Sequence, residues 1–467
     1  MKKHSLFKMI AIFVAVAVIL SWIFPITYYG YSYTEDAVSP VGILELFSSW
    51  PTLINYFGIV VFYILTVGGF YGILYKTDGY RNLLDKIVSK FKGKENIFLI
   101  FVMLIFAVIT SMTGITSGLL FLFPLIISVI ILMGYNKQTA ALVTIGSVAI
   151  GLIGTTVSAV NTEVMVSILG IKFGQELLTK GIILLVGLVL LVFNTLSYAK
   201  KHKNITESKD EEQLELPVSK NEKKRTWPII VIIDLVLLVM IMGSISWESV
   251  LGVKVFTQLH KGIMGVTIGD YAIFANLLGG VKAFGAWTLV EFIMVLFLAT
   301  GLIGLIYRVK FNDFISSYFE GMKKALKPAF LVAFAYLVLV ITAMHPVFLG
   351  MFKPMLTATN GFNPFTMSIV AFINSVFCIE PYYIASATGS LQYAVSIITD
   401  TTVYPTIAIV WQTMQGLAAL IAPTSVVLVA TLSYLDVSFW QWIKTSWKLI
   451  LEILVALLII FTILILI

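Results

Sequence analysis

Long apolar runs separated by short polar loops make up most of the chain. A helix needs about 20 mostly apolar residues to cross a hydrocarbon core of about 30 Å. Runs of roughly this length are residues 6–25, 52–75, 177–193, 227–242, 284–306, 328–344 and 439–467. We therefore predict an all-α polytopic membrane protein, in which residues 247–283 have a mixed pattern that allows no assignment.

Two other apolar stretches are interrupted near the middle by polar residues, at 110–118 within residues 97–133 and at 378–390 within residues 365–398. The apolar arms on either side are too short to span a membrane comfortably. Irregular backbone at membrane depth is tolerated only where it is buried in protein or lines a wet cavity. The pattern favours two re-entrant hairpins. For the first stretch, the alternative is a continuous kinked helix, or two short tilted helices whose small residues serve packing.

Two polar breaks divide further apolar segments of the chain. The first break, residues 155–163, follows the apolar run 137–154, and the second, residues 421–425, follows the run 403–420. Each pattern is typical of a transmembrane helix interrupted partway, a feature that many secondary transporters share. The order of hairpin, broken helix and closing helix therefore occurs twice.

Basic residues mark one side of the predicted membrane. Basic residues directly follow Met1, cluster in residues 76–94 and occur again at residues 200–203. The acidic residues Glu35 and Asp36 lie in the first loop on the other side. The positive-inside rule then places the N-terminus in the cytoplasm, with the amphipathic part of segment 76–94 along the inner interface. The first hairpin enters from the inside and the second from the outside, so we predict two inverted repeats.

The pattern divides the chain into five parts. Residues 1–96 supply scaffold helices and a cytoplasmic amphipathic helix, and residues 97–198 supply the first hairpin, broken helix and closing helix. Residues 199–226 form a charged cytoplasmic linker. Residues 227–364 supply the scaffold helices of the second repeat, and residues 365–467 its hairpin, broken helix and closing helix. The N-terminal run resembles a signal peptide but lacks a small-residue cleavage site, so we interpret it as a retained first helix.

Composition and charge exclude several other classes of protein. Hydrophobic residues form 59% of the 467 residues and charged residues only 12%, whereas soluble domains carry about 25% charged residues. The net charge of +7 lies in the basic loops and gives no reason to expect nucleic-acid binding. Cys378 is the single cysteine, and His, Asp and Cys do not have the clustered spacing of an enzyme or metal site. We expect no enzyme activity, no metal and no cofactor, apart from a coupling ion, H⁺ or Na⁺.

Inverted repeats place the substrate site near the bilayer midplane, where the interrupted helices meet. Helix ends leave N–H groups with partial positive charge there, and carbonyl groups with partial negative charge. This mixture suits a small zwitterion or a carboxylate. The candidate substrate-binding residues at the breaks and hairpin tips are Ser111, Thr113, Thr116, Ser117, Asn161, Thr162, Glu163, Glu380, Ser386, Thr388, Thr424 and Ser425. The alternative role for the hydroxyl and amide groups is local capping or helix packing.

Glu163 and Glu380 are the most informative candidates, because an unpaired ionised carboxylate costs several kcal/mol at membrane depth. Either residue could bind a substrate ammonium or guanidinium group, or carry a coupling proton. The alternatives are an ion pair or a neutral buried carboxyl for Glu163, and a solvated side chain for Glu380. Two acids, one from each half, favour a cationic amino acid as the substrate.

Four segments of the chain resemble one family of transporters. Residues 121–126, 133–136, 420–425 and 435–444 are similar to the anaerobic four-carbon dicarboxylate carrier family, which includes arginine/ornithine antiporters and belongs to the larger ion transporter superfamily. The resemblance covers most of the chain and is most distinctive at the Pro-Thr-Ser of the third segment. It implies a scaffold domain, a moving transport domain, elevator-type exchange and a homodimer in the lipid bilayer.

The chain departs from the family pattern at three places. Val426 stands where relatives carry glycine, residues 161–163 replace an Asn-Pro-Phe, and Ser117 and Gly118 replace an acidic pair. We expect a secondary transporter of a small-molecule substrate in the cell membrane, with basic amino acid exchange as the first interpretation. The alternatives are a dicarboxylate or other organic anion carrier coupled to H⁺ or Na⁺, and an ion channel, although two broken helices favour alternating access.

Overall fold

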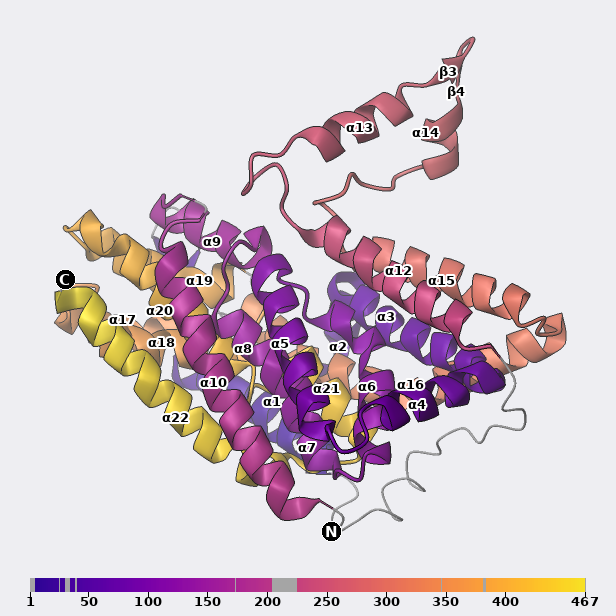
Figure 1. Cartoon of the computed structure of the whole chain (residues 1–467). Coiled ribbons are helices and arrows are strands. Elements are labelled where there is room, and N and C mark those ends of the chain that lie inside the picture. The colour runs from indigo at the N-terminus through magenta and orange to yellow at the C-terminus, as the bar shows by residue number, and fades with distance from the viewer. Residues whose placement is uncertain are drawn as a thin grey trace.

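A computed structural model shows the protein as a bundle of helices (Figure 1). Two very small antiparallel β-hairpins accompany the helices. It describes residues 5–24, 26–29, 34–37, 40–172, 174–203, 225–345, 347–380 and 384–466. The side chains of residues 26–29, 34–37, 161 and 384–388 lie outside this description, as does most of the predicted linker.

Eight helices among the described residues are long and apolar enough to cross a membrane. They are α1 (Ser5–Ile23), α3 (Trp50–Lys76), α5 (Glu95–Thr113), α10 (Leu177–His202), α12 (Trp227–Ser244), α15 (Leu289–Ile306), α16 (Phe311–Met344) and α22 (Phe439–Leu466). The prediction of a polytopic all-helical protein is confirmed in its main feature. The exceptions are the strand pairs β1 (Ile26–Tyr29) with β2 (Thr34–Ala37), and β3 (Thr267–Ile268) with β4 (Tyr271–Ala272).

Shorter helices complete the bundle and the loops. In the first half they are α2 (Glu45–Ser48), α4 (Asp78–Lys90), the 3₁₀ turn η2 (Ser117–Phe121), α6 (Phe123–Leu132), α7 (Lys137–Ala141), the π turn η3 (Leu142–Gly146), α8 (Ser147–Ile153) and α9 (Ala159–Leu169). In the second half they are α13 (Val255–Met264), α14 (Ile273–Leu278), α17 (Phe348–Ala358), α18 (Pro364–Phe377), α19 (Ile384–Ile397), η4 (Thr401–Val403), α20 (Tyr404–Ala418) and α21 (Val426–Leu435).

The first interrupted stretch forms a helical hairpin. The chain turns at Gly114, which has a φ of +73°, and returns through η2 and α6. The hydroxyl of Tyr135, after α6, donates to Oδ1 of Asn96 at the start of α5 over 2.9 Å, so both ends lie on the same side. This reversal excludes the continuous kinked helix. The arm α5 is longer than expected, because Thr113 stays helical and donates its hydroxyl to the carbonyl of Ile109.

The second interrupted stretch, α18 and α19, also forms a hairpin. Each arm has 14 residues, about 21 Å at 1.5 Å per residue, which is shorter than a bilayer core. Gly361, just before α18, lies so close to α19 that a Cβ there would be 2.6 Å from the carbonyl oxygen of Ala394. The two ends of this hairpin therefore also meet.

Both predicted broken helices are present, with different boundaries. The first is helical to Ile153 and resumes at Ala159, so residues 161–163 lie inside α9 and outside the break that we expected to contain them. The hydroxyl of Thr162 donates to the carbonyl of Ser158 over 2.6 Å, which satisfies this polar side chain within a helix. The second break spans residues 419–425, slightly more than predicted.

The predicted span 328–344 is the second half of one continuous helix of 34 residues, α16, which begins at Phe311. Pro328 lies inside this helix and does not end it. On the same helix, Gly321 packs against Gly68 and Gly72 of α3 so closely that a Cβ at any of them would overlap the opposing backbone. Small residues at such crossings let two membrane helices approach each other closely.

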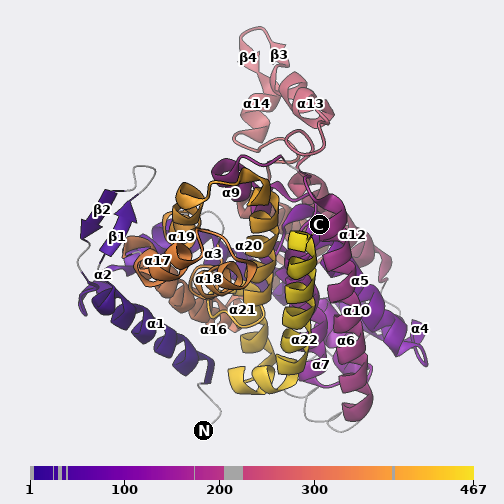
Figure 2. The same ribbon diagram turned by 90° about the vertical axis from the view of Figure 1, so that its left-hand side faces the viewer.

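The packing contacts between helices divide most of them into two groups. The frame group consists of α1, α3, α12, α15 and α16, with contacts such as the ring pairs Phe62–Phe297 and Phe7–Phe334. The hairpin group consists of α5 to α10 and α18 to α22. Residues 247–283, which the sequence did not assign, lie in α13, β3, β4 and α14, which project from one end of the bundle beside α9 (Figure 2).

Candidate functional site

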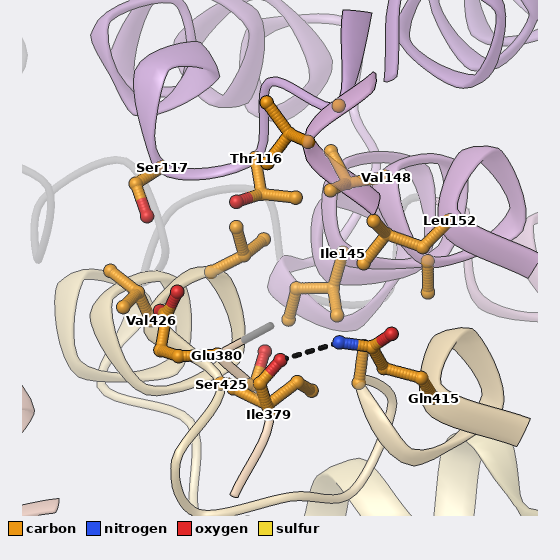
Figure 3. A pocket seen from close by; sticks show the side chains of 15 residues that line it. Thr116, Ser117, Ile145, Val148, Leu152, Ile379, Glu380, Gln415, Ser425 and Val426 are labelled. Atoms are coloured by element: carbon orange, nitrogen blue, oxygen red, sulfur yellow. Dashed lines mark hydrogen bonds between the residues drawn. The ribbon is translucent and has the colours of Figure 1, made fainter. Parts of the chain in front are cut away.

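A cavity of about 80 Å³ lies where the two hairpin tips meet the two broken helices. Its wall combines the turn between α5 and η2, the end of α8 with the start of α9, the end of α18, and the end of α20 with the start of α21. Thr116 and Ser117 lie on one side of it and Glu380, Gln415 and Ser425 on the other (Figure 3). All four backbone discontinuities therefore converge on one place.

Three helices begin at this cavity. Ser117 starts η2, Val160 belongs to the first turn of α9, and Val426 and Val427 form the first turn of α21. Ser425 caps α21, and its hydroxyl accepts from the N–H of Leu428 over 3.4 Å. Because the first N–H groups of a helix have no partner within it, helix N-termini carry partial positive charge and attract anions.

Four helices also end at the cavity. Gly114 follows α5, Leu152 is near the end of α8, Ile379 follows α18 and Ala419 follows α20. Helix C-termini leave carbonyl groups with partial negative charge, which suit a cation or a proton donor. Just beyond the end of α18, the carbonyl of Ile379 accepts from the side-chain amide of Gln415 over 2.7 Å (Figure 3).

Glu380 is half-buried and lines the cavity. The hydroxyl of Tyr336, a fully buried residue of α16, donates to Oε1 of Glu380 over 2.6 Å. A neutral hydrogen bond offsets only part of the several kcal/mol that an ionised carboxylate costs in such surroundings. The carboxyl group at the tip of the second hairpin thus contacts the frame group while it lines the cavity.

Several other predicted site residues are buried beside the cavity without lining it. The Ser111 hydroxyl donates to the carbonyl of Gly154 over 2.5 Å, and Thr424 donates to the carbonyl of Val376 over 3.2 Å. In each half, hydrogen bonding therefore joins the first hairpin arm to the break of the next helix. Thr113, Ser111, Thr162 and Thr424 all use their hydroxyls on backbone carbonyls, the capping and packing role that the sequence left open.

Glu163 does not lie where the sequence analysis expected it. It is exposed on α9 and is not among the residues that line the cavity. The reason is the early start of α9, which turns the residue away from the break. The side chains of Asn161, Ser386 and Thr388 fall outside the described part of the chain, so their predicted roles stay predictions.

Two polar residues at the site were missed by the sequence analysis. Tyr336 lies in the apolar half of α16, and Gln415 in the apolar run of α20. Their polarity within long apolar runs was a usable signal. Only the folded structure shows that these two side chains reach the tip of the second hairpin.

Comparison with known proteins supports the resemblance found in the sequence. Residues 49–467 match the family model described as the C4-dicarboxylate anaerobic carrier, DcuC. An uncharacterised protein of Haemophilus influenzae is 24% identical over 402 residues, which cover 82% of this chain and 71% of that protein. The crystal structure of the Alcanivorax borkumensis YdaH transporter aligns with 99% of this chain and 98% of its own at 11% identity; its TM-score of 0.41 adds nothing to the assignment.

The family model spans the hairpins, both broken helices and the cavity between them. Long apolar helices and interrupted helices that meet at a shared cavity are typical of membrane carriers. With eight candidate spans among its described residues, the chain is a multi-pass membrane transporter that belongs to the C4-dicarboxylate anaerobic carrier family.

Proposed function

We propose that the protein carries a small four-carbon dicarboxylate across the cell membrane by alternating access, coupled to H⁺ or Na⁺. The observation that carries this proposal is the meeting of helix N-termini at one cavity, together with the hydroxyls of Thr116, Ser117 and Ser425. Hydroxyl and N–H donors aimed at one point suit carboxylate oxygens. The description of the family as a C4-dicarboxylate carrier agrees with this chemistry.

Basic amino acid exchange, the first interpretation from the sequence, is not supported. It depended on two acids facing the substrate, one from each half. Glu163 is exposed on α9, so Glu380 is the one member of the pair that lines the cavity. The family match names a dicarboxylate carrier, which was the alternative interpretation.

The proposed coupling site uses the carbonyl ends of helices and Glu380. The C-terminal ends of α5, α8 and α20, where helix carbonyl groups carry partial negative charge, lie at the cavity wall. Glu380 has a neutral hydrogen-bond partner in Tyr336, so its carboxyl group can gain and lose a proton without disrupting an ion pair. We assign to Glu380 the coupling proton, with Na⁺ at the helix ends as the alternative.

The proposed mechanism is movement of the hairpin group along the frame group, in an elevator-type exchange within a homodimer. It rests on the repeated order of hairpin, broken helix and closing helix, which we interpret as two inverted repeats. The five segments predicted from the sequence serve as the domain boundaries of this scheme. The basic loops at residues 76–94 and 200–203 support a cytoplasmic N-terminus.

Counterflow into proteoliposomes tests the substrate and the transport mode together. We expect vesicles preloaded with unlabelled succinate to accumulate labelled succinate in a saturable way, and labelled arginine to stay at the level of protein-free vesicles. Arginine counterflow without succinate counterflow would reject the dicarboxylate. Flux that does not saturate, together with electrical conductance, would indicate a channel.

Ser425 supplies a direct test of the site. We expect Ser425→Ala to raise the KM for succinate about tenfold, because a hydrogen bond to a charged group contributes about 1.5–3 kcal/mol. Ser425→Thr, which keeps the hydroxyl, should restore most of the affinity. Ser167→Ala is the control, since the Ser167 hydroxyl is on the exposed side of α9 and donates to the carbonyl of Val164. Equal KM values for Ser425→Ala and Ser167→Ala would remove Ser425 from the site.

A further inference from the structure

A second, larger cavity of about 400 Å³ lies between the two groups of helices. Its walls are α3 and α16 of the frame group, and η2, α6 and α21 of the hairpin group. Its volume falls within the range of about 300–1,000 Å³ that is usual for small-molecule pockets. No residue that lines it also lines the cavity described above.

The two cavities follow one another along the same two elements. On α21, Val427 lines the first cavity and Thr431 the second. On η2, Ser117 lines the first and Leu120 the second. In both cases the step is one turn of the helix, about 5–6 Å. The second cavity is therefore positioned next to the proposed substrate site, on the side away from the hairpin tip that carries Glu380.

Charge at the second cavity is predominantly positive. Three exposed lysines, Lys76, Lys324 and Lys327, line it, against a single acidic lining residue, Glu320. Lys327 also forms an exposed ion pair with Asp436, with 2.8 Å between Nζ and Oδ1. A concave surface that carries one sign of charge raises the local concentration of an oppositely charged solute.

The interior of this cavity holds hydroxyl groups that lack a protein partner. The side-chain oxygens of Thr431 and Ser433 are buried, line the cavity and make no hydrogen bond within the described part of the chain. Buried polar atoms are nearly always satisfied by protein, water or ligand. Exposed cations and, deeper in the wall, buried polar side chains form a graded path for a carboxylate.

We propose that this second cavity is the entry vestibule through which the dicarboxylate reaches the substrate site from the side of the basic loops. Lys76 and Lys324 attract the dianion, and Thr431 and Ser433 line the path along which it passes. This inference rests on the proposed function, because it takes a dicarboxylate as the solute. It adds a second site, with assigned residues and a direction of entry.

The KM for succinate entry, measured from the membrane face that carries the basic loops, tests the vestibule. Lys324→Gln and Lys76→Gln each remove a charge that lines the cavity, and Lys323→Gln removes an exposed charge that does not. In vesicles of neutral phosphatidylcholine, we expect Lys324→Gln and Lys76→Gln to raise the KM for succinate entry from this face about threefold at low salt. The maximal rate should stay unchanged, the difference should shrink at high salt, and Lys323→Gln should behave as the unsubstituted protein.

A chemical readout tests the same charge without transport. Thr431→Cys, in a Cys378→Ala background, places one thiol in the cavity. We expect Lys324→Gln to slow its modification by an anionic methanethiosulfonate reagent severalfold, and to leave the rate with a neutral reagent unchanged. Equal rates, or equal KM values for Lys324→Gln and Lys323→Gln, would overturn the vestibule. If the unsubstituted protein does not transport succinate, the proposed function itself is overturned.

Discussion

At the scale of single residues, the decisive contact joins Glu380 to Tyr336. The carboxyl group belongs to the tip of a hairpin and the hydroxyl to a frame helix, and they meet over 2.6 Å at the cavity wall. Glutamate in a transporter core is costly unless it is neutral or paired. A neutral donor such as tyrosine can hold the carboxyl group in either protonation state, which is what a proton carrier requires.

Substitution of Glu380 by glutamine separates proton coupling from substrate exchange. The amide of Glu380→Gln can still accept from Tyr336 but cannot release a proton. We expect uptake of succinate driven by a pH gradient to fall at least about tenfold, with succinate counterflow kept within about threefold, by analogy with the 10²–10⁴-fold range of proton-transfer groups. Glu163→Gln is the matched control and should leave both unchanged. Full pH-driven uptake by Glu380→Gln would exclude this role.

At the scale of elements, the two broken helices cross at a point that only glycine permits. A Cβ on Gly416 of α20 would overlap the backbone nitrogen of Ile153 at the end of α8. Trp442 of α22 fixes the same region, because its indole N–H donates to the carbonyl of Leu420 over 2.7 Å. Close approach of these backbones brings both breaks to one cavity.

Enlarging Gly416 should therefore separate the two helices. We expect Gly416→Val to lower the free energy of unfolding by about 2 kcal/mol or more, as overpacking does in a filled core. Gly301→Ala in α15 is the control, since a Cβ there meets open space and alanine is the better helix former. Thermal unfolding in detergent, followed by size-exclusion chromatography, measures both. Equal midpoints for the two variants would show that the crossing can relax.

The sequence predicts the elements of this fold better than their limits. Two hairpins and two breaks follow from short apolar arms around polar centres. The predicted break at residues 155–163 is longer than the observed one, because α9 begins at Ala159. The hydroxyl of Thr162 donates to the carbonyl of Ser158, so this polar residue does not interrupt the helix. Tyr336 and Gln415 could not be assigned to the site, because their role depends on contacts with residues 44 and 36 positions away.

At the scale of the whole molecule, several polar contacts besides that of Tyr336 with Glu380 join the frame and hairpin groups. Tyr63 and Tyr71 of α3 donate to the carbonyls of Gly118 and Phe121 in η2, over 2.6 and 2.7 Å. Lys327 of α16 meets Asp436 at the end of α21. In the proposed elevator, each of these contacts breaks when the hairpin group moves, whereas contacts within either group persist.

Cross-linking across this boundary tests the proposed movement. A short bifunctional thiol reagent applied to Lys327→Cys with Asp436→Cys, in a Cys378→Ala background, ties α16 to the end of α21. We expect succinate uptake to fall to the level of protein-free vesicles, because the hairpin group can then no longer move along the frame. The control, Lys448→Cys with Glu452→Cys, cross-links two positions one turn apart on α22 and should retain uptake. If mass spectrometry confirms the first cross-link and uptake persists, α16 and α21 move together and the boundary between the groups lies elsewhere.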